Sequence, residues 1–113
     1  MTPFRDGSVD IDAFRGLLEA QRSAGVAGVV PCGCTGEAAT LSGHERMRLL
    51  ETALETVGDS LSVIPGTGSN STATSITLTK EAEKAGAHAA MLITPYYNKP
   101  SQAGLIDHYR RVA

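Results

Sequence analysis

The stretch VAGVVPCGCTGEAATL, residues 26–41, joins a short apolar run to a glycine-rich loop. Its first part, residues 26–31, is rich in β-branched residues without polar alternation, which is typical of a strand covered on both faces. The same arrangement returns twice, as LSVIP (61–65) before GTGSN (66–70) and as HAAMLITP (88–95) before YYNKP (96–100). We therefore expect three strands, each of which leads into a loop.

Helical patterns lie before, between and after these apolar runs. Ser42 and Glu45 have the spacing of a capping box, and glycines follow the ends of the helical patterns. Parallel neighbouring strands need such helical crossovers, so the alternation predicts an α/β fold of about three βα units with parallel strands. The expected helices are Ile11–Ala24 behind an Asp10 cap, Ser42 to Gly58, Ser71 or Thr72 to Ala85, and a last one from Ser101. Their expected apolar faces are Ile11, Phe14, Leu17, Leu18 and Ala24; Met47, Leu50, Leu54 and Val57; and Leu105, Tyr109 and Val112.

Length and composition set limits on the class of protein. A chain of 113 residues is one domain at most, and a formal net charge of −2 gives no reason to expect nucleic acid or a membrane as partner. No apolar run approaches the ~20 residues that cross a bilayer, and residues 1–12 lack the pattern of a signal peptide. Two cysteines fit a reducing compartment, so a cytoplasmic location is expected.

Three parallel strands alone would leave two unpaired sheet edges. A closed barrel of eight βα units takes about 250 residues. We therefore expect residues 1–113 to form part of a larger domain.

The loops after the strands are the candidate site, because ligands of parallel α/β sheets bind at the carboxyl ends of the strands. Gly33, Thr35 and Gly36 place backbone amides where a small anion could approach. Tyr96 and Tyr97 bring two phenols to the same rim. A rim rich in glycines and hydroxyls fits the binding of a small carboxylate and the movement of its protons.

Other readings of these residues stay open. GTGSN lacks the Gly-Lys-Ser/Thr ending of a nucleotide-binding loop, and the two tyrosines could equally be one packed ring and one surface phenol. Cys32 and Cys34 are expected on the same side of an extended segment, with neither a disulfide nor a metal site favoured. Neither metal nor cofactor is predicted. His44, His88 and His108 are expected to be surface or hydrogen-bonded core residues.

Taken together, MTPF, GCTGEAATLS, GTGSNST and TPYYNKPSQAGLIDHY resemble the 4-hydroxy-tetrahydrodipicolinate synthase family of pyruvate-dependent aldolases, whose superfamily includes N-acetylneuraminate lyase. The resemblance covers essentially the whole chain, and YYNKPSQ favours the synthase branch. It implies a (β/α)8 TIM barrel of which residues 1–113 are the N-terminal portion. It also implies a lyase in lysine and diaminopimelate biosynthesis. There a lysine forms a Schiff base with pyruvate, and the enamine attacks aspartate semialdehyde.

The resemblance assigns roles by position. Thr35, flanked by Gly33 and Gly36, matches the site of the pyruvate carboxylate. Tyr97 matches a proton-relay tyrosine that reaches into a neighbouring subunit, which implies a homo-oligomer. Cys34 stands where the family has the relay threonine, and a thiol is a weaker hydrogen-bonding group than a hydroxyl.

A second family site, which binds the inhibitor lysine at a subunit interface, is less well matched. Asn70 and Tyr96 fit it, so they are candidate interface or effector residues. Other positions differ, and inhibition by lysine is therefore not expected. The departures are Ala38, Gly43, Arg46 and Thr74.

The family's Schiff-base lysine lies beyond these residues, and Lys80, Lys84 and Lys99 do not occupy its position. We therefore expect the chain by itself to be inactive. Two alternatives remain. One is a related pyruvate aldolase, of the N-acetylneuraminate lyase or keto-deoxy sugar acid type. The other is a non-catalytic partial barrel that pairs through its open strand edges.

Overall fold

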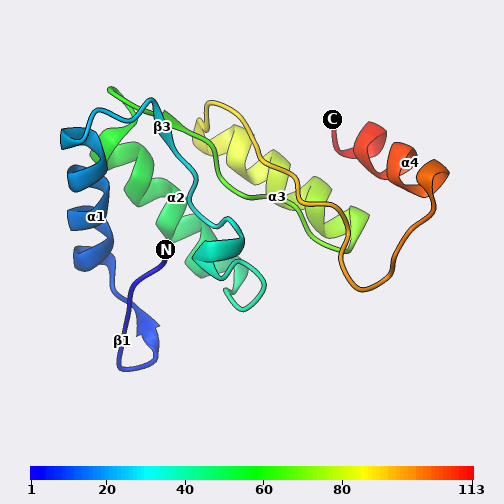
Figure 1. Ribbon diagram of the computed structural model, residues 1–113, viewed down its shortest axis with the longest axis horizontal. Coiled ribbons are helices and arrows are strands. Elements are labelled where there is room, and N and C mark those ends of the chain that lie inside the picture. Colours follow the sequence, from blue (N-terminus) through cyan, green and yellow to red (C-terminus); the bar gives the residue numbers. More distant parts are fainter.

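The computed structural model describes all of residues 1–113, in which four α-helices alternate with short extended segments (Figure 1). The helices are α1 (Ile11–Ser23), α2 (Gly43–Val57), α3 (Thr72–Ala85) and α4 (Gln102–Val112), with a 3-10 helix, η1, at Cys34–Gly36. The strands are β1 (Phe4–Arg5), β2 (Ser8–Val9), β3 (Gly28–Val29) and β4 (Ser62–Val63).

The helices begin where the capping residues predict. The Asp10 side chain accepts a hydrogen bond from the Ala13 amide at 3.0 Å, and Ser71 and Ser101 cap α3 and α4 in the same way. Ser42 and Glu45 form the predicted capping box, in which both reciprocal hydrogen bonds are present. The two hydrogen bonds from Ser42, first from its hydroxyl and then from its amide, lower the pKa of Glu45. These four predicted helix starts are confirmed.

The first two predicted strands pair in parallel, as expected. The register places Gly28 opposite Ser62 and Val29 opposite Val63. Backbone hydrogen bonds continue beyond these residues, and the last runs from the Gly66 amide to the Pro31 carbonyl at 2.8 Å. The two extended segments therefore end together, and the loops that follow them start side by side.

The third predicted strand, residues 88–95, is not a regular strand. It joins the sheet through an isolated parallel bridge between Gly66 and Met91. The Val63 amide donates to the Nδ1 atom of His88 at 3.1 Å instead of to a backbone carbonyl. Backbone hydrogen bonds still join the two segments, from the His88 amide to the Val63 carbonyl at 3.1 Å and from the Met91 amide to the Pro65 carbonyl at 2.9 Å. Pro65 has no amide hydrogen to donate, so the ladder is interrupted there, although the segment lies beside β4.

A β-hairpin near the N-terminus was not predicted. β1 and β2 pair antiparallel around Asp6 and Gly7, whose φ angles are 51° and 78°. Two positive φ angles in a two-residue turn are typical of a type I′ hairpin, for which Asp-Gly is a strong sequence signal. The turn signal was present in the sequence, but β1 and β2 have only two residues each and show no strand pattern.

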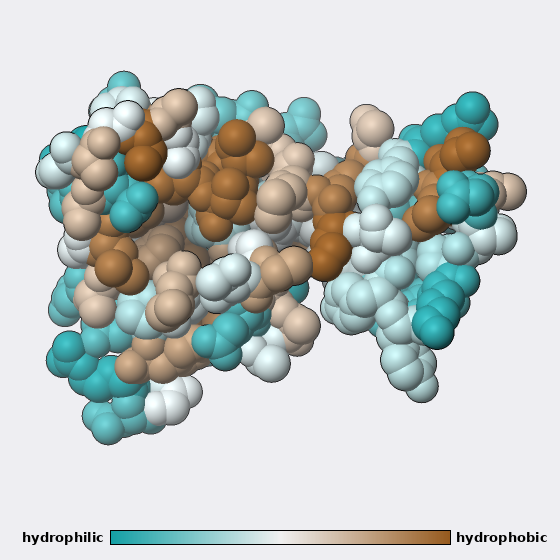
Figure 2. All heavy atoms as spheres, in the orientation of Figure 1, coloured by the Kyte–Doolittle hydropathy of each residue, from teal (hydrophilic) through white to brown (hydrophobic).

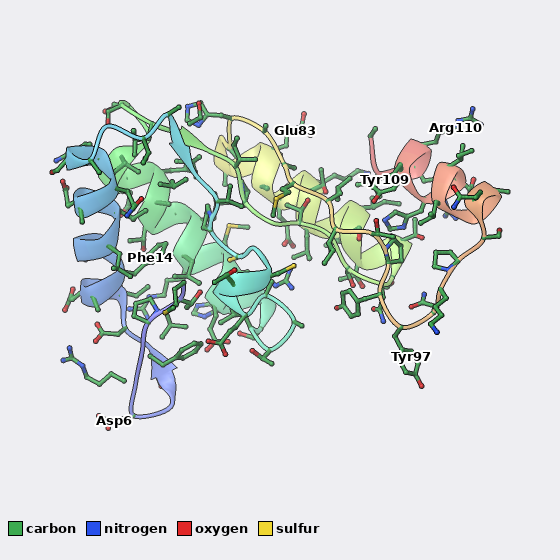
Figure 3. All side chains as sticks on the ribbon, in the orientation of Figure 1. Asp6, Phe14, Glu83, Tyr97, Tyr109 and Arg110 are labelled. Atoms are coloured by element: carbon green, nitrogen blue, oxygen red, sulfur yellow. The ribbon has the colours of Figure 1, made fainter.

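The core lies between α1, α2 and the parallel pair. Leu49 and Val63 are fully buried, and the Phe14 side chain points from α1 toward α2 (Figure 3). Leu49 was not among the expected apolar positions of α2. The core cluster consists of Ile11, Phe14, Leu18, Cys32, Leu41, Leu49, Leu50, Ala53, Val57, Leu61, Val63 and Ala82.

Two expectations about burial are wrong. Leu17 is 44% exposed and Ala24 is exposed, because the buried stripe of α1 is narrower than predicted. Val30 is 48% exposed, so the first strand is not covered on both faces. Figure 2 shows hydrophobic atoms exposed across the middle of one face of the molecule, between more hydrophilic ends. No helix is long and apolar enough to span a membrane.

Candidate functional site

The loops after the three extended segments converge on one cavity of about 300 Å³. Of the predicted site residues, the cavity brings together Gly33, Cys34 and Tyr96. Thr35, Gly36, Asn70 and Tyr97 are not among the residues that line it. The lining residues are Cys32, Gly33, Cys34, Glu37, Ala38, Ala39, Thr40, Arg46, Gly66, Gly68, Met91, Ile93 and Tyr96.

The glycine-rich loop after β3 tightens into η1. The Gly36 amide donates to the Gly33 carbonyl at 3.0 Å, and the Gly36 carbonyl accepts a hydrogen bond from the Thr2 hydroxyl at 2.7 Å. The amide and the carbonyl of Gly36 are therefore both used in hydrogen bonds within the chain. The amides of Cys34 and Thr35 lie in the first turn of η1 and have no acceptor within the chain. Thr35 is an exposed residue at this turn.

The two cysteines lie in different environments, and neither forms a disulfide. Cys32 has a φ of 57°, which turns the chain, so the expectation that both thiols lie on one side of an extended segment is wrong. Cys32 is 4% exposed, and burial raises the pKa of its thiol to about 11, partly offset by the positive charge of Arg46. Cys34 is exposed at the cavity, where a thiol can meet a ligand.

Adjacent tyrosines point to different places. Tyr96 lines the cavity, whereas Tyr97 is 93% exposed with a φ of 70°. Figure 3 shows Tyr97 projecting away from the body of the molecule, on the loop before α4. The Nδ2 atom of Asn98 donates to the Asn70 carbonyl at 2.9 Å, which ties this loop to the one after β4.

The histidines belong to the framework. His88 accepts the Val63 amide, and His44 is exposed. His108 is buried, and its Nδ1 atom lies 3.0 Å from the Thr72 hydroxyl, which joins α4 to α3. The chain contains no group of three or more His, Cys, Asp or Glu side chains arranged to hold a metal ion.

Two glycines of the loop after β4 allow close approach of neighbouring chain segments. A Cβ atom on Gly66 would lie 2.0 Å from the Cys32 carbonyl oxygen, and one on Gly68 would lie 2.4 Å from the Ile93 amide nitrogen. These glycines therefore shape the cavity wall, and a role in holding an anion is not needed to explain them.

Arg46 is the cavity residue that sequence reasoning placed least well. The sequence marked it only as a departure from an effector site, and nothing in the sequence distinguishes it from nearby Arg48. In the structure its Nε atom donates to the Ala38 carbonyl at 3.1 Å, and its Nη2 atom contacts the same oxygen. Its Nη1 atom is buried and has no hydrogen-bond partner.

Comparison with known proteins gives a consistent result. A sequence model of the Dihydrodipicolinate synthetase family matches residues 1–113. The 4-hydroxy-tetrahydrodipicolinate synthase of Syntrophobacter fumaroxidans is 54% identical over 113 residues, which are 100% of this chain and 39% of that protein. The synthase of Thermodesulfovibrio yellowstonii is 50% identical over the same span, also 39% of its length.

The fold comparison agrees. The crystal structure of dihydrodipicolinate synthase from Aquifex aeolicus superimposes with a TM-score of 0.96 at 39% identity, covering 99% of this chain and 38% of that one. The chain thus spans about 39% of the length of the curated relatives that it matches. Its three βα units correspond to part of a TIM barrel, as the sequence predicted.

Proposed function

The chain belongs to the dihydrodipicolinate synthetase family, and from this premise we propose that it forms the carboxylate-binding and proton-relay portion of a 4-hydroxy-tetrahydrodipicolinate synthase. The observation that carries the proposal is the match of the family over all of residues 1–113, together with relatives of that name at 54% and 50% identity. The proposed reaction of the complete barrel is the condensation of pyruvate with aspartate semialdehyde through a lysine Schiff base. No cofactor takes part in it.

Thr35 is the proposed ligand of the pyruvate carboxylate. Two unpaired amides, those of Cys34 and Thr35, stand beside its exposed hydroxyl. Amides that already lack an acceptor can bind a carboxylate without breaking a hydrogen bond of the fold. Gly33 precedes them in extended conformation and opens the turn.

Cys34 and Tyr97 are the proposed relay positions. The Cys34 thiol is exposed at the cavity, which supports access to a reacting molecule. Tyr97 extends outward from its loop, which suits a side chain that completes the site of another subunit in a homo-oligomer. Asn70 and Tyr96 remain predicted interface or effector residues. A cytoplasmic location is proposed with the biosynthetic role.

Residues 1–113 supply no nucleophile for the covalent step under this proposal. Lys80 and Lys84 are exposed on α3, and Lys99 is exposed in the loop before α4. None of the three is at the cavity. Without a lysine in the site, pyruvate cannot be converted into an enamine. We therefore expect this chain alone to catalyse no condensation.

Reductive trapping tests the missing nucleophile. The chain is incubated with labelled pyruvate and borohydride and analysed by mass spectrometry. We expect no adduct, with a complete synthase from a relative as the positive control. A pyruvate adduct on Lys80, Lys84 or Lys99 would overturn this part of the proposal.

A chimera tests the function itself. Residues 1–113 replace the matching 39% of the Syntrophobacter fumaroxidans synthase, and condensation of pyruvate with aspartate semialdehyde is assayed. We expect activity that Thr35→Ala reduces mainly through a higher KM for pyruvate, because it removes a carboxylate contact. A chimera that folds as the parent does but lacks activity would contradict the proposal.

A further inference from the structure

Helix α3 carries a threonine that forms its hydrogen bond outside the helix. The hydroxyls of Thr52, Thr56 and Thr77 each donate to the carbonyl four residues earlier, a common bond of helical threonines. The Thr79 hydroxyl instead donates to the Thr67 hydroxyl, which lies 2.8 Å away in the loop after β4. Figure 1 shows this loop running along α3 to the start of that helix. Thr79 therefore connects α3 to the loop.

The loop after β4 is fixed by hydrogen bonds on two sides. On the side of β3, the Gly66 amide donates to the Pro31 carbonyl at 2.8 Å. On the side of α3, the Ser69 amide donates to the Oγ atom of Ser75 at 2.9 Å. Thr67 is 3% exposed and Ser75 is fully buried, so the groups that hold the loop to α3 are shielded from water. Removing one of them leaves its partner buried without a hydrogen bond, which is costly.

The same loop contacts the chain just ahead of the proposed carboxylate site. A Cβ atom on Gly66 would lie 2.0 Å from the Cys32 carbonyl oxygen, so the two backbones are in direct contact. Gly33 follows Cys32 and leads into η1, where the amides of Cys34 and Thr35 have no acceptor within the chain. A displacement of Gly66 would therefore move these two amides.

We propose that Thr79 is a positioning residue, which holds Gly66 against Cys32 and thereby keeps the first amides of η1 in the geometry that binds a carboxylate. Thr79 itself does not line the cavity, and its hydroxyl is paired with that of Thr67. Its influence on a ligand is therefore indirect. The inference rests on the proposed function, because it concerns the support of the same carboxylate site.

Amide NMR on the full 113-residue chain tests the link between α3 and η1. Thr79→Val keeps the shape of the side chain and removes its hydroxyl, and we expect it to shift the amide signals of Cys34 and Thr35. Thr79→Ser keeps the hydroxyl and should leave both signals close to those of the parent chain. Thr77→Val is the matched control, because it removes a hydroxyl hydrogen bond from an exposed residue of the same helix. We expect it to leave both signals in place.

The chimera described above tests the consequence for pyruvate. We expect Thr79→Val to raise the KM for pyruvate roughly twofold to tenfold, the range that corresponds to the loss of one hydrogen bond. The value of kcat and the KM for aspartate semialdehyde should change less, and Thr79→Ser should restore the KM for pyruvate. Loss of stability alone would act differently, because unfolded molecules lower the apparent kcat and leave KM unchanged.

A double-mutant cycle assigns the effect to the pair of hydroxyls. If Thr79 acts through Thr67, then Thr67→Val should also raise the KM for pyruvate. The variant that carries both substitutions should have a KM no higher than that of the weaker single variant, since both changes remove the same hydrogen bond.

Several results would overturn the proposal. One is the absence of a shift at Cys34 and Thr35 in Thr79→Val, and another is an equal shift in Thr77→Val. A third is a fall in kcat at constant KM for pyruvate, and a fourth is additive effects in the cycle. An inactive parent chimera would instead contradict the proposed function, and the amide signals would still decide whether Thr79 positions η1.

Discussion

At the scale of single residues, two cysteines that are two positions apart have opposite chemical character. Cys32 is buried in the core cluster beneath the cavity, whereas Cys34 is exposed on η1. A thiolate is the reactive form of cysteine, and burial disfavours that form. Thiol reagents should therefore modify Cys34 in the folded chain and reach Cys32 only after unfolding.

Cys32 also makes stability depend on pH. Burial raises the pKa of its thiol from 9.0 to about 11 in the folded chain. Between these values the unfolded chain binds fewer protons than the folded one, so stability is complete below pH 9 and falls as the pH rises toward 11. The loss amounts to roughly 2–3 kcal/mol at about 1.4 kcal/mol per pH unit. Urea unfolding at pH 8 and pH 11 measures it.

Cys32→Ala is the control for this prediction. The variant retains every tyrosine and lysine that also titrates in the alkaline range, so the difference between the two chains isolates Cys32. We expect the variant to start from a lower stability and to lose less of it on going to pH 11. An equal loss in both chains would show that Cys32 does not contribute.

At the scale of elements, a glycine lowers stability inside a helix but permits close packing in a loop that follows a strand. Gly16 is inside α1, and a Cβ atom there would meet nothing within 4 Å. Gly66 follows β4, and a Cβ atom there would collide with the Cys32 carbonyl. The same substitution therefore tests helix propensity at one position and close packing of chain segments at the other.

The two substitutions should change stability in opposite directions. We expect Gly16→Ala to stabilise by about 0.5–1 kcal/mol, because alanine loses less backbone entropy in a helix. Gly66→Ala should destabilise by roughly 1–3 kcal/mol or more, because two backbone segments must separate. Thermal unfolding of both variants beside the parent chain measures the signs. A neutral Gly66→Ala would mean that the two loops are not held as the structure shows.

Local signals explain which elements could be predicted. Asp10, Ser42, Ser71 and Ser101 act within their own helices, so their pattern is sufficient to place the helix starts. The third predicted strand lies beside β4 in parallel, as expected, but it forms only an isolated bridge, because Pro65 has no amide hydrogen for the ladder. The hairpin at Asp6-Gly7 was predictable from its turn signal.

The site was predictable in its location and less so in its geometry. The loops after the strands converge because parallel segments end at one edge, which the alternating pattern already implied. Arg46 could not be found in this way, because its side chain reaches the Ala38 carbonyl across the turn from η1 to α2, a contact that no local pattern marks. The roles proposed for Thr35 and Tyr97 come from the family resemblance and not from the geometry.

At the scale of the whole molecule, the chain is elongated and its buried residues are distributed unevenly. The radius of gyration is 14.3 Å, against about 13 Å for a compact domain of this length. Only 24 of 113 residues are buried, most of them around α1, α2 and the parallel pair. Figure 1 shows α4 set apart at one end, beside α3.

The rate of amide hydrogen exchange should differ between α4 and α2. α4 buries only His108 and Val112 and packs on α3, whereas α2 buries five residues between its neighbours. We expect amides of α4 to exchange through local opening at lower free energy than amides of α2. Mass spectrometry of exchanged peptides measures this, and equal protection of the two helices would contradict it.

The loop that carries Tyr97 is also a place where proteases can cleave the chain. Its tip, Tyr97 to Lys99, is exposed, and exposed loop tips are preferred sites of nicking. The Tyr97–Asn98 bond suits chymotrypsin, whereas Lys99 precedes Pro100 and therefore resists trypsin. Chymotrypsin would release α4 from the rest of the chain at a point that trypsin leaves intact, so a limited digest with the two enzymes would show whether another subunit shields this loop.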